Sequence, residues 1–153
     1  MPEERVLVIE DSIHIQDVLR TMVLEPRGYE VLSATRGDEG LRIALEEQPD
    51  LVILDERMPG MTGVELLEAL QEECVDLPVI FTTLHGSEDL VVKVFRLGVR
   101  DYIIKPFEAH EMERAVERVL TEARLRQERD RLLRELQKAN ERLERQVHEM
   151  RIL

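Results

Sequence analysis

Two short apolar runs, each ending in acidic residues, constrain the fold of this chain most strongly. The run 51–54, Leu-Val-Ile-Leu, ends at Asp55, and the run 6–9, Val-Leu-Val-Ile, ends at Glu10 and Asp11. Four consecutive apolar residues are typical of a strand that is buried on both faces, as in a parallel sheet. The two runs therefore predict two strands whose carboxyl ends carry three acids.

Three carboxylates at one edge of a sheet repel one another unless a cation offsets their charge. Carboxylate oxygens are ligands that Mg²⁺ prefers in proteins. We therefore expect Glu10, Asp11 and Asp55 to form a Mg²⁺ site. One acid in such a cluster can also act as a nucleophile toward phosphorus, so the cluster predicts phosphoryl chemistry.

Strand-like runs alternate with helical spacing along the first two thirds of the chain. The predicted strands are residues 6–9, 30–34, 51–54, 79–82 and 101–104. The apolar residues that predict the helices between them are Ile15, Val18, Leu19 and Met22; Leu41, Ala44 and Leu45; Val64, Leu67 and Leu70; and Val91, Val94 and Phe95. This alternation predicts an α/β fold, in which helices cover both faces of a five-stranded parallel sheet. The ligand crevice of such a sheet lies beyond the carboxyl ends of its strands, where the acids fall.

Two other predicted strands end in groups that bind phosphate. The fourth leads into Thr83, and the fifth leads into Lys105. A hydroxyl and an ammonium group can hold the oxygens of a phosphoryl group carried on Asp55. Each feature has a simpler alternative, since an acid after a strand can cap the next helix and a lysine can be a solvated charge. The agreement of several strand ends favours a site.

The motifs occur in a characteristic order: Glu10-Asp11, Asp55-x-x-Met58-Pro59-x-x-x-Gly63, Thr83, Tyr102 and Lys105-Pro106-Phe107. In this order they resemble the receiver domain of two-component response regulators, over about the first 120 residues of the chain. The resemblance implies a flavodoxin-like fold with strand order 2-1-3-4-5. It also implies that a sensor histidine kinase or a phosphotransfer protein phosphorylates Asp55.

The same resemblance implies roles for individual residues. Asp11 and Asp55 are expected to bind Mg²⁺ directly, the backbone carbonyl of Arg57 is expected to be a third ligand, and Glu10 is expected to act through water. Lys105 and Thr83 are expected to hold the phosphoryl oxygens. A cis peptide bond is implied between Lys105 and Pro106, which proline permits.

A conformational switch is expected from two of these residues. Thr83 is expected to move toward the new phosphoryl group, and Tyr102 can then turn inward. Alternatively, Tyr102 packs as an ordinary strand residue against the fourth helix. Leu84 and Arg57 are large residues at positions beside the phosphoacceptor, and we expect them to slow the loss of phosphate.

Residues 108–153 contain neither glycine nor proline, which predicts that the last helix of the domain continues without a break. Its first turns are expected to pack on the core through Met112, Val116, Val119 and Leu120. Farther along, apolar residues recur at steps of three and four, with one asparagine among them. This seam, as we call it below, consists of Leu133, Leu136, Asn140, Leu143, Val147 and Met150.

The seam predicts a parallel two-stranded coiled coil, in which Asn140 pairs with its own copy. The alternative is a single solvated helix, held by pairs such as Glu141 with Arg145. We favour the dimer, because a lone helix gains nothing from a sustained apolar stripe. The expected domains are a receiver over residues 1–121 and a helical coiled-coil extension over residues 122–153. Since no capping residue follows the extension, we expect it to link to an output domain in a longer regulator.

Composition limits the possible functions. The net charge of −12 and the aromatic fraction of 3% argue against binding of nucleic acid or of an anionic membrane by this chain. The sequence has a single cysteine, no signal peptide and no long apolar segment, so we expect a cytoplasmic protein.

We expect a signalling phosphoacceptor rather than an enzyme, with only self-phosphotransfer and slow autodephosphorylation as its reactions. One alternative is a dimerisation scaffold that does not depend on phosphorylation. Another is a Mg²⁺-dependent phosphohydrolase resembling haloacid dehalogenases. Such hydrolases need an aspartate two residues after the nucleophile, and that position is Arg57 here.

Overall fold

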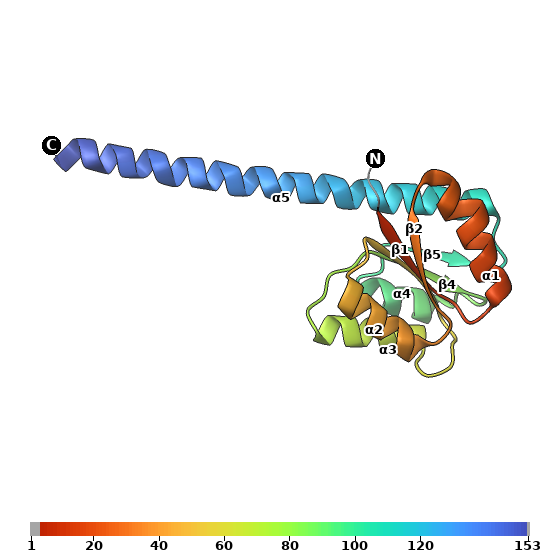
Figure 1. Cartoon of the computed structure of the whole chain (residues 1–153). Helices are drawn as coiled ribbons and strands as arrows, with labels where there is room; N and C mark the ends of the chain where they lie inside the picture. The colour runs from red at the N-terminus through yellow and green to blue at the C-terminus, as the bar shows by residue number, and fades with distance from the viewer. Residues whose placement is uncertain (1–3, 153) are drawn as a thin grey trace. The chain divides into compact units, whose positions relative to one another are not determined.

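The computed structural model describes residues 4–152 and contains one five-stranded parallel sheet (Figure 1). The strands are β1 (Arg5–Ile9), β2 (Glu30–Ala34), β3 (Leu51–Asp55), β4 (Val79–Thr83) and β5 (Asp101–Ile104). Their order in the sheet is β2-β1-β3-β4-β5, which confirms the predicted topology. Residues 1–3, at the start of the predicted receiver, and Leu153, at the end of the predicted extension, lie outside the described residues.

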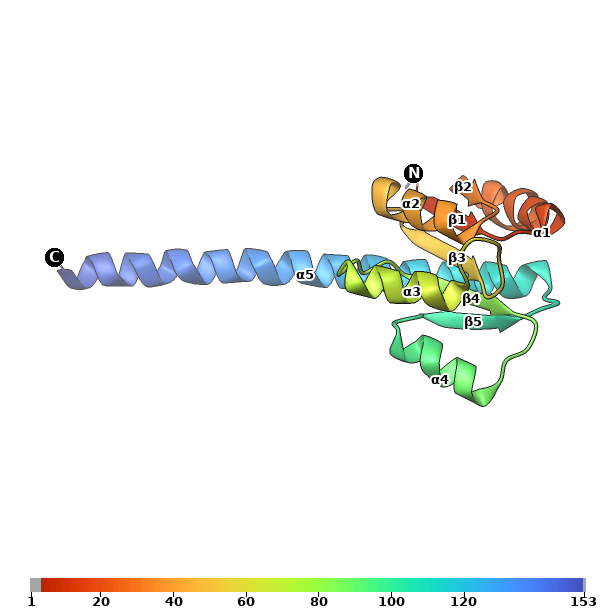
Figure 2. The ribbon, with the colours of Figure 1, turned by 90° about the horizontal axis from the view of Figure 1, so that it is seen from below.

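Helices cover both faces of the sheet, as predicted (Figure 2). They are α1 (Ile13–Val18), α2 (Gly37–Glu47), α3 (Gly63–Glu72), α4 (Glu88–Arg96) and α5 (Ala109–Ile152). One buried cluster joins alternate strand residues to the helical residues 15–24 and to the first turns of α5, including all four residues predicted to pack there. The other cluster joins the opposite face of the sheet to α2, α3 and α4. The alternation of side chains along each strand produces these two layers.

The first helix differs from the prediction in its winding. After α1 the chain continues as a π-helix, η1 (Leu19–Leu24), and then as a short 3₁₀ turn, η2 (Glu25–Arg27), which ends at Gly28 with φ of 86°. Met22, one of the residues whose spacing predicted the helix, is exposed, and Val23 is buried instead. A π-helix has more residues per turn than an α-helix, so the buried face moves along the sequence.

The register of the sheet brings the predicted site residues to one edge. Asp55 is opposite Thr82 in the β3–β4 pair, and Thr83 is opposite Ile104 in the β4–β5 pair. Ile9 and Leu54 are paired directly before the acids of β1 and β3. The carboxyl ends of β1, β3, β4 and β5 therefore lie in a row.

Contacts between residues divide the chain into two units, one up to Leu120 and one from Thr121 onward. The division falls one residue before the predicted domain boundary. The second unit is the later part of α5, where the apolar residues of the seam are exposed in the single chain. Among residues 4–152, no helix combines the length and the hydropathy needed to cross a membrane.

Candidate functional site

Three carboxylates meet at the carboxyl edge of the sheet. Glu10 and Asp11 follow β1, and Asp55 is the last residue of β3. One oxygen from each of the three lies within 4.8 Å of the others. Glu10 and Asp55 are buried, whereas Asp11 is exposed. The arrangement offers clustered oxygen ligands, with one side open to solvent.

Glu10 is held in place by polar contacts from the start of α1. The side-chain amide of Gln16, which is buried, donates to the carbonyl oxygens of Glu10 at 2.8 Å and Ala34 at 2.7 Å. The backbone N–H of Ser12 donates to Glu10 Oε2 at 3.1 Å, and the Ser12 hydroxyl caps α1. These bonds fix the turn between β1 and α1, and with it the direction of the Glu10 carboxylate.

Lys105 lies between two of the acids. Its Nζ is 2.5 Å from Glu10 Oε1 and 2.9 Å from Asp55 Oδ1. Burial alone would lower the pKa of Lys105, but the hydrogen bonds to Glu10 and Asp55 and the charges of these two acids together outweigh burial, so the pKa is raised and the ammonium stays charged. The peptide bond from Lys105 to Pro106 is cis, as the resemblance implies.

Glu10 is the acid whose ionisation is most perturbed. Burial raises its pKa from 4.5 to about 7, against the opposing effect of the hydrogen bonds from Lys105 and Ser12. The charge of Asp55 contributes to this rise, though less than burial does. Between pH 4.5 and a pH of about 7, the folded chain holds a proton on Glu10 that the unfolded chain releases. The free energy of unfolding therefore falls as the pH rises through this range.

The substitution Glu10→Gln is therefore expected to stabilise the metal-free protein more at pH 8 than at pH 5. Above a pH of about 7 the buried Glu10 carboxylate of the folded wild type must ionise, and this costs free energy that the amide of the variant avoids. We put this cost at about 2 kcal/mol after allowing for solvent screening. Urea unfolding in the presence of a chelator, with wild type measured in parallel at both pH values, tests this. An equal difference in unfolding free energy at the two pH values would contradict it.

Two neighbouring threonines carry hydroxyl groups at the end of β4, and both are buried. Thr82 Oγ1 lies 3.4 Å from Asp55 Oδ1. Thr83 Oγ1 instead donates to Glu56 Oε1 at 2.5 Å. Sequence reasoning assigned the phosphoryl contact to Thr83 and no part of the site to Glu56. No signal in the sequence singles out Glu56, because a side-chain contact across two strands depends on rotamers.

Large side chains surround the opening to the acids. A cavity of about 320 Å³ is lined by the three acids, by Lys105 and by Glu56, Arg57, Leu84 and His85, with Ser12 and Ile15. Arg57 and Leu84 are both exposed at its wall. The structure thus places them beside Asp55, where the sequence predicted an obstruction.

Tyr102 lies in β5, half-buried, against α4. Its ring meets that of Phe95 edge to face, with centroids 5.9 Å apart. This is the packing expected of an ordinary strand residue against the fourth helix. Whether Tyr102 turns inward on phosphorylation stays a prediction.

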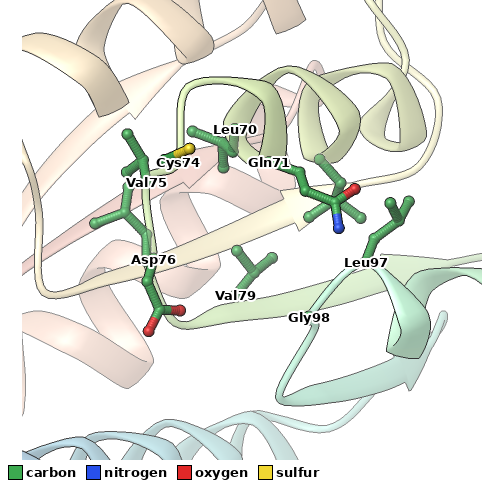
Figure 3. A pocket seen from close by; sticks show the side chains of 10 residues that line it. Leu70, Gln71, Cys74, Val75, Asp76, Val79, Leu97 and Gly98 are labelled. Atoms are coloured by element: carbon green, nitrogen blue, oxygen red, sulfur yellow. The ribbon is translucent and has the colours of Figure 1, made fainter.

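A second cavity, of about 200 Å³, lies at the opposite edge of the sheet, where β4 begins (Figure 3). Leu70, Val79 and Leu97 give it an apolar wall, and Cys74 lies at its margin. The one carboxylate among its lining residues, Asp76, pairs with Arg100 at 3.5 Å. The cavity has no part in the acid cluster.

Comparison with known proteins matches this fold and this arrangement of residues. The family model of the response regulator receiver domain covers residues 6–117. The chain belongs to this family. The receiver is thus a component of two-component signalling, a class whose members interact with kinases.

The match to this chain covers different shares of two curated relatives. Sporulation initiation phosphotransferase F of Bacillus subtilis is 33% identical over 120 residues, which are 78% of this chain and 96% of that protein. The phosphate regulon transcriptional regulatory protein PhoB of Pseudomonas aeruginosa is 33% identical over 122 residues, which are 78% of this chain and 53% of that protein. The chain therefore spans about half the length of this second relative.

A solved structure shows the same fold. The CheY-like response regulator receiver domain protein of Methanospirillum hungatei superposes on the receiver with a TM-score of 0.72 at 30% identity. The match covers 78% of this chain and 94% of that protein.

Proposed function

We propose that the receiver accepts a phosphoryl group on Asp55 from a sensor histidine kinase or a phosphotransfer protein. The observation that carries this proposal is the position of Asp55. Its carboxylate ends a buried strand, contacts Lys105 at 2.9 Å and lines the cavity at the sheet edge. A nucleophile beside a fixed cation and an open cavity suits phosphoryl transfer.

The acid cluster fits Mg²⁺. Three carboxylates within 4.8 Å of one another offer the hard oxygen ligands that this ion prefers. Asp11 and Asp55 would hold it directly, together with the carbonyl of Arg57, and Glu10 would act through water. When bound, Mg²⁺ would offset the repulsion between the carboxylate and an anionic phosphoryl donor.

In the proposed step, a carboxylate oxygen of Asp55 attacks phosphorus, and an acyl phosphate bond forms as the bond from phosphorus to the donor nitrogen breaks. The electron pair of that bond stays with the imidazole nitrogen of the donor. Lys105, which contacts both Glu10 and Asp55, can shift its ammonium group toward the incoming oxygens without leaving the site. The product is an aspartyl phosphate that stores the signal.

Phosphotransfer measured on intact chains tests this proposal. Wild type is expected to gain the mass of one phosphoryl group when it is incubated with Mg²⁺ and a phosphorylated donor, and Asp55→Ala is expected to gain none. Binding of beryllofluoride, a mimic of the phosphoryl group, separates the proposal from a scaffold that does not depend on phosphorylation. A wild-type chain that gains no mass and binds no beryllofluoride would favour the scaffold.

The rest of the proposal concerns output. We expect a cytoplasmic homodimer that forms through the seam, with phosphorylation changing the pairing or rotation of α5. Binding of nucleic acid or of a membrane is no part of this proposal. Turnover of small phosphorylated substrates is also no part of it, because Arg57 occupies the position where haloacid-dehalogenase-like hydrolases need an aspartate.

The substitution Leu84→Ala is expected to speed the loss of phosphate from Asp55 by about threefold or more, a barrier change of about 0.7 kcal/mol. Leu84 lines the cavity beside Asp55, so its removal opens a path for water. The half-life of the phosphorylated chain measures the effect. The control is Val92→Ala, which trims another exposed apolar side chain, on α4 and outside the cavity lining. Equal half-lives for Leu84→Ala and wild type would show that the Leu84 side chain does not shield the phosphoryl group from water.

A further inference from the structure

Glu56 is held rigidly between the phosphoacceptor and the end of β4. Its backbone N–H donates to the carbonyl of Thr82 at 2.9 Å, and its own carbonyl accepts from the N–H of Gly63 at 2.8 Å. With the backbone held on both sides, the carboxylate lies against β4 and accepts the hydrogen bond from Thr83 at 2.5 Å. A bond to a charged acceptor is among the stronger hydrogen bonds in proteins.

The Thr83 hydroxyl has only one proton to donate. The backbone N–H of His85 donates to Thr83 Oγ1 at 3.2 Å, which occupies one acceptor position of that oxygen. Two acceptors lie within reach of the proton, Glu56 Oε1 at 2.5 Å and the carbonyl oxygen of His85 at 3.2 Å, so the shorter bond holds it on Glu56 in the unphosphorylated chain. A phosphoryl group on Asp55 would need the same proton.

We infer that Glu56 is a positioning residue that restrains Thr83 in the resting state and so opposes the phosphorylated conformation. This inference rests on the proposed phosphoacceptor function of Asp55. Glu56 also lines the cavity that contains Asp55, and its negative charge could oppose the phosphoryl group directly. The two effects differ in one respect, because only the first passes through the Thr83 hydroxyl.

A double-mutant cycle separates these effects. In the presence of Mg²⁺, Glu56→Ala is expected to tighten beryllofluoride binding by about tenfold, as expected for loss of one competing charge-assisted hydrogen bond. In a Thr83→Ala background the same substitution is expected to change binding by less than about twofold. Glu56→Gln, which keeps an acceptor but loses the charge, is expected to lie between wild type and Glu56→Ala.

Glu72→Ala is the control for net charge. It removes one exposed carboxylate from the last turn of α3, at the opposite edge of the sheet, and should leave binding unchanged. Two results would overturn the inference: no tightening in Glu56→Ala, or equal tightening in both Thr83 backgrounds.

A second readout does not depend on phosphoryl chemistry. The three-bond couplings of the Thr83 methyl carbon, measured by NMR on the full chain without Mg²⁺, report the χ1 angle of this side chain. Glu56→Ala is expected to convert one fixed χ1 value into an average over rotamers. An unchanged coupling overturns the inference whatever the function of the site. A changed coupling in a chain that binds no beryllofluoride supports the restraint and counts against the proposed function instead.

Discussion

Lys105→Ala is expected to weaken beryllofluoride binding by at least about 100-fold and to destabilise the metal-free protein at pH 8 by about 3 kcal/mol. Lys105 is the cation that contacts both Glu10 and Asp55, and those two carboxylates are buried. Removing the ammonium leaves the carboxylates to repel each other where water cannot screen them well. Titration with beryllofluoride and urea unfolding with a chelator measure the two effects.

The matched control for Lys105→Ala is Lys93→Ala, which removes an exposed lysine from α4. A surface substitution of this kind should change the free energy of unfolding by no more than about 0.5 kcal/mol. Addition of Mg²⁺ should return part of the stability lost in Lys105→Ala, because the proposed ion would bind the cluster only in the folded chain. If Lys105→Ala and wild type unfold at the same urea concentration, the ammonium does not hold the acids together.

The double substitution Leu136→Asn with Leu143→Asn is expected to convert the proposed dimer into a monomer. Both leucines are more than half exposed in the single chain, so only a partner can bury them. Burial of one leucine is worth at least about 1.5 kcal/mol, and a dimer would lose four of them. The predicted loss is at least about 6 kcal/mol, or more than about 10⁴-fold in the dissociation constant. Analytical ultracentrifugation measures the masses.

The matched control for the seam is Lys138→Asn with Arg145→Asn. This variant also introduces two asparagines, but on the opposite face of the same helical segment. This variant is expected to keep the mass of wild type. A wild-type chain that sediments as a monomer at all accessible concentrations would favour the solvated single helix. In that case the pairs between neighbouring charges, such as Arg131 with Glu128 and Glu135, are what supports the helix.

The sheet and its acid cluster could be predicted because each depends on consecutive residues. An uninterrupted apolar run predicts a strand buried on both faces, and the residue after it must lie at the sheet edge. The prediction therefore placed Asp55, Glu10 and Lys105 together, and the structure brings them within contact distance. The strand order came from the resemblance to receivers rather than from the runs themselves.

Features that depend on the winding of the backbone or on rotamers could not be predicted. The spacing of apolar residues assumed an α-helix through Met22, whereas the π-helix buries Val23. The partner of Thr83 was also missed. Glu56 is one of 33 acidic residues, and its contact with Thr83 spans 27 positions, so only the paired strands show that the two meet.

The start of α3 determines where the site can move. A side chain at Gly63 would place its first carbon 2.5 Å from the carbonyl oxygen of Asp55 and 2.8 Å from the ring of Phe81, so helix and strand already meet at the closest possible approach. This side of Asp55 has no room for a further side chain. If Asp55 is phosphorylated as proposed, we expect the rearrangement on the other side, at the ends of β4 and β5, and we expect the signal to leave the site in that direction.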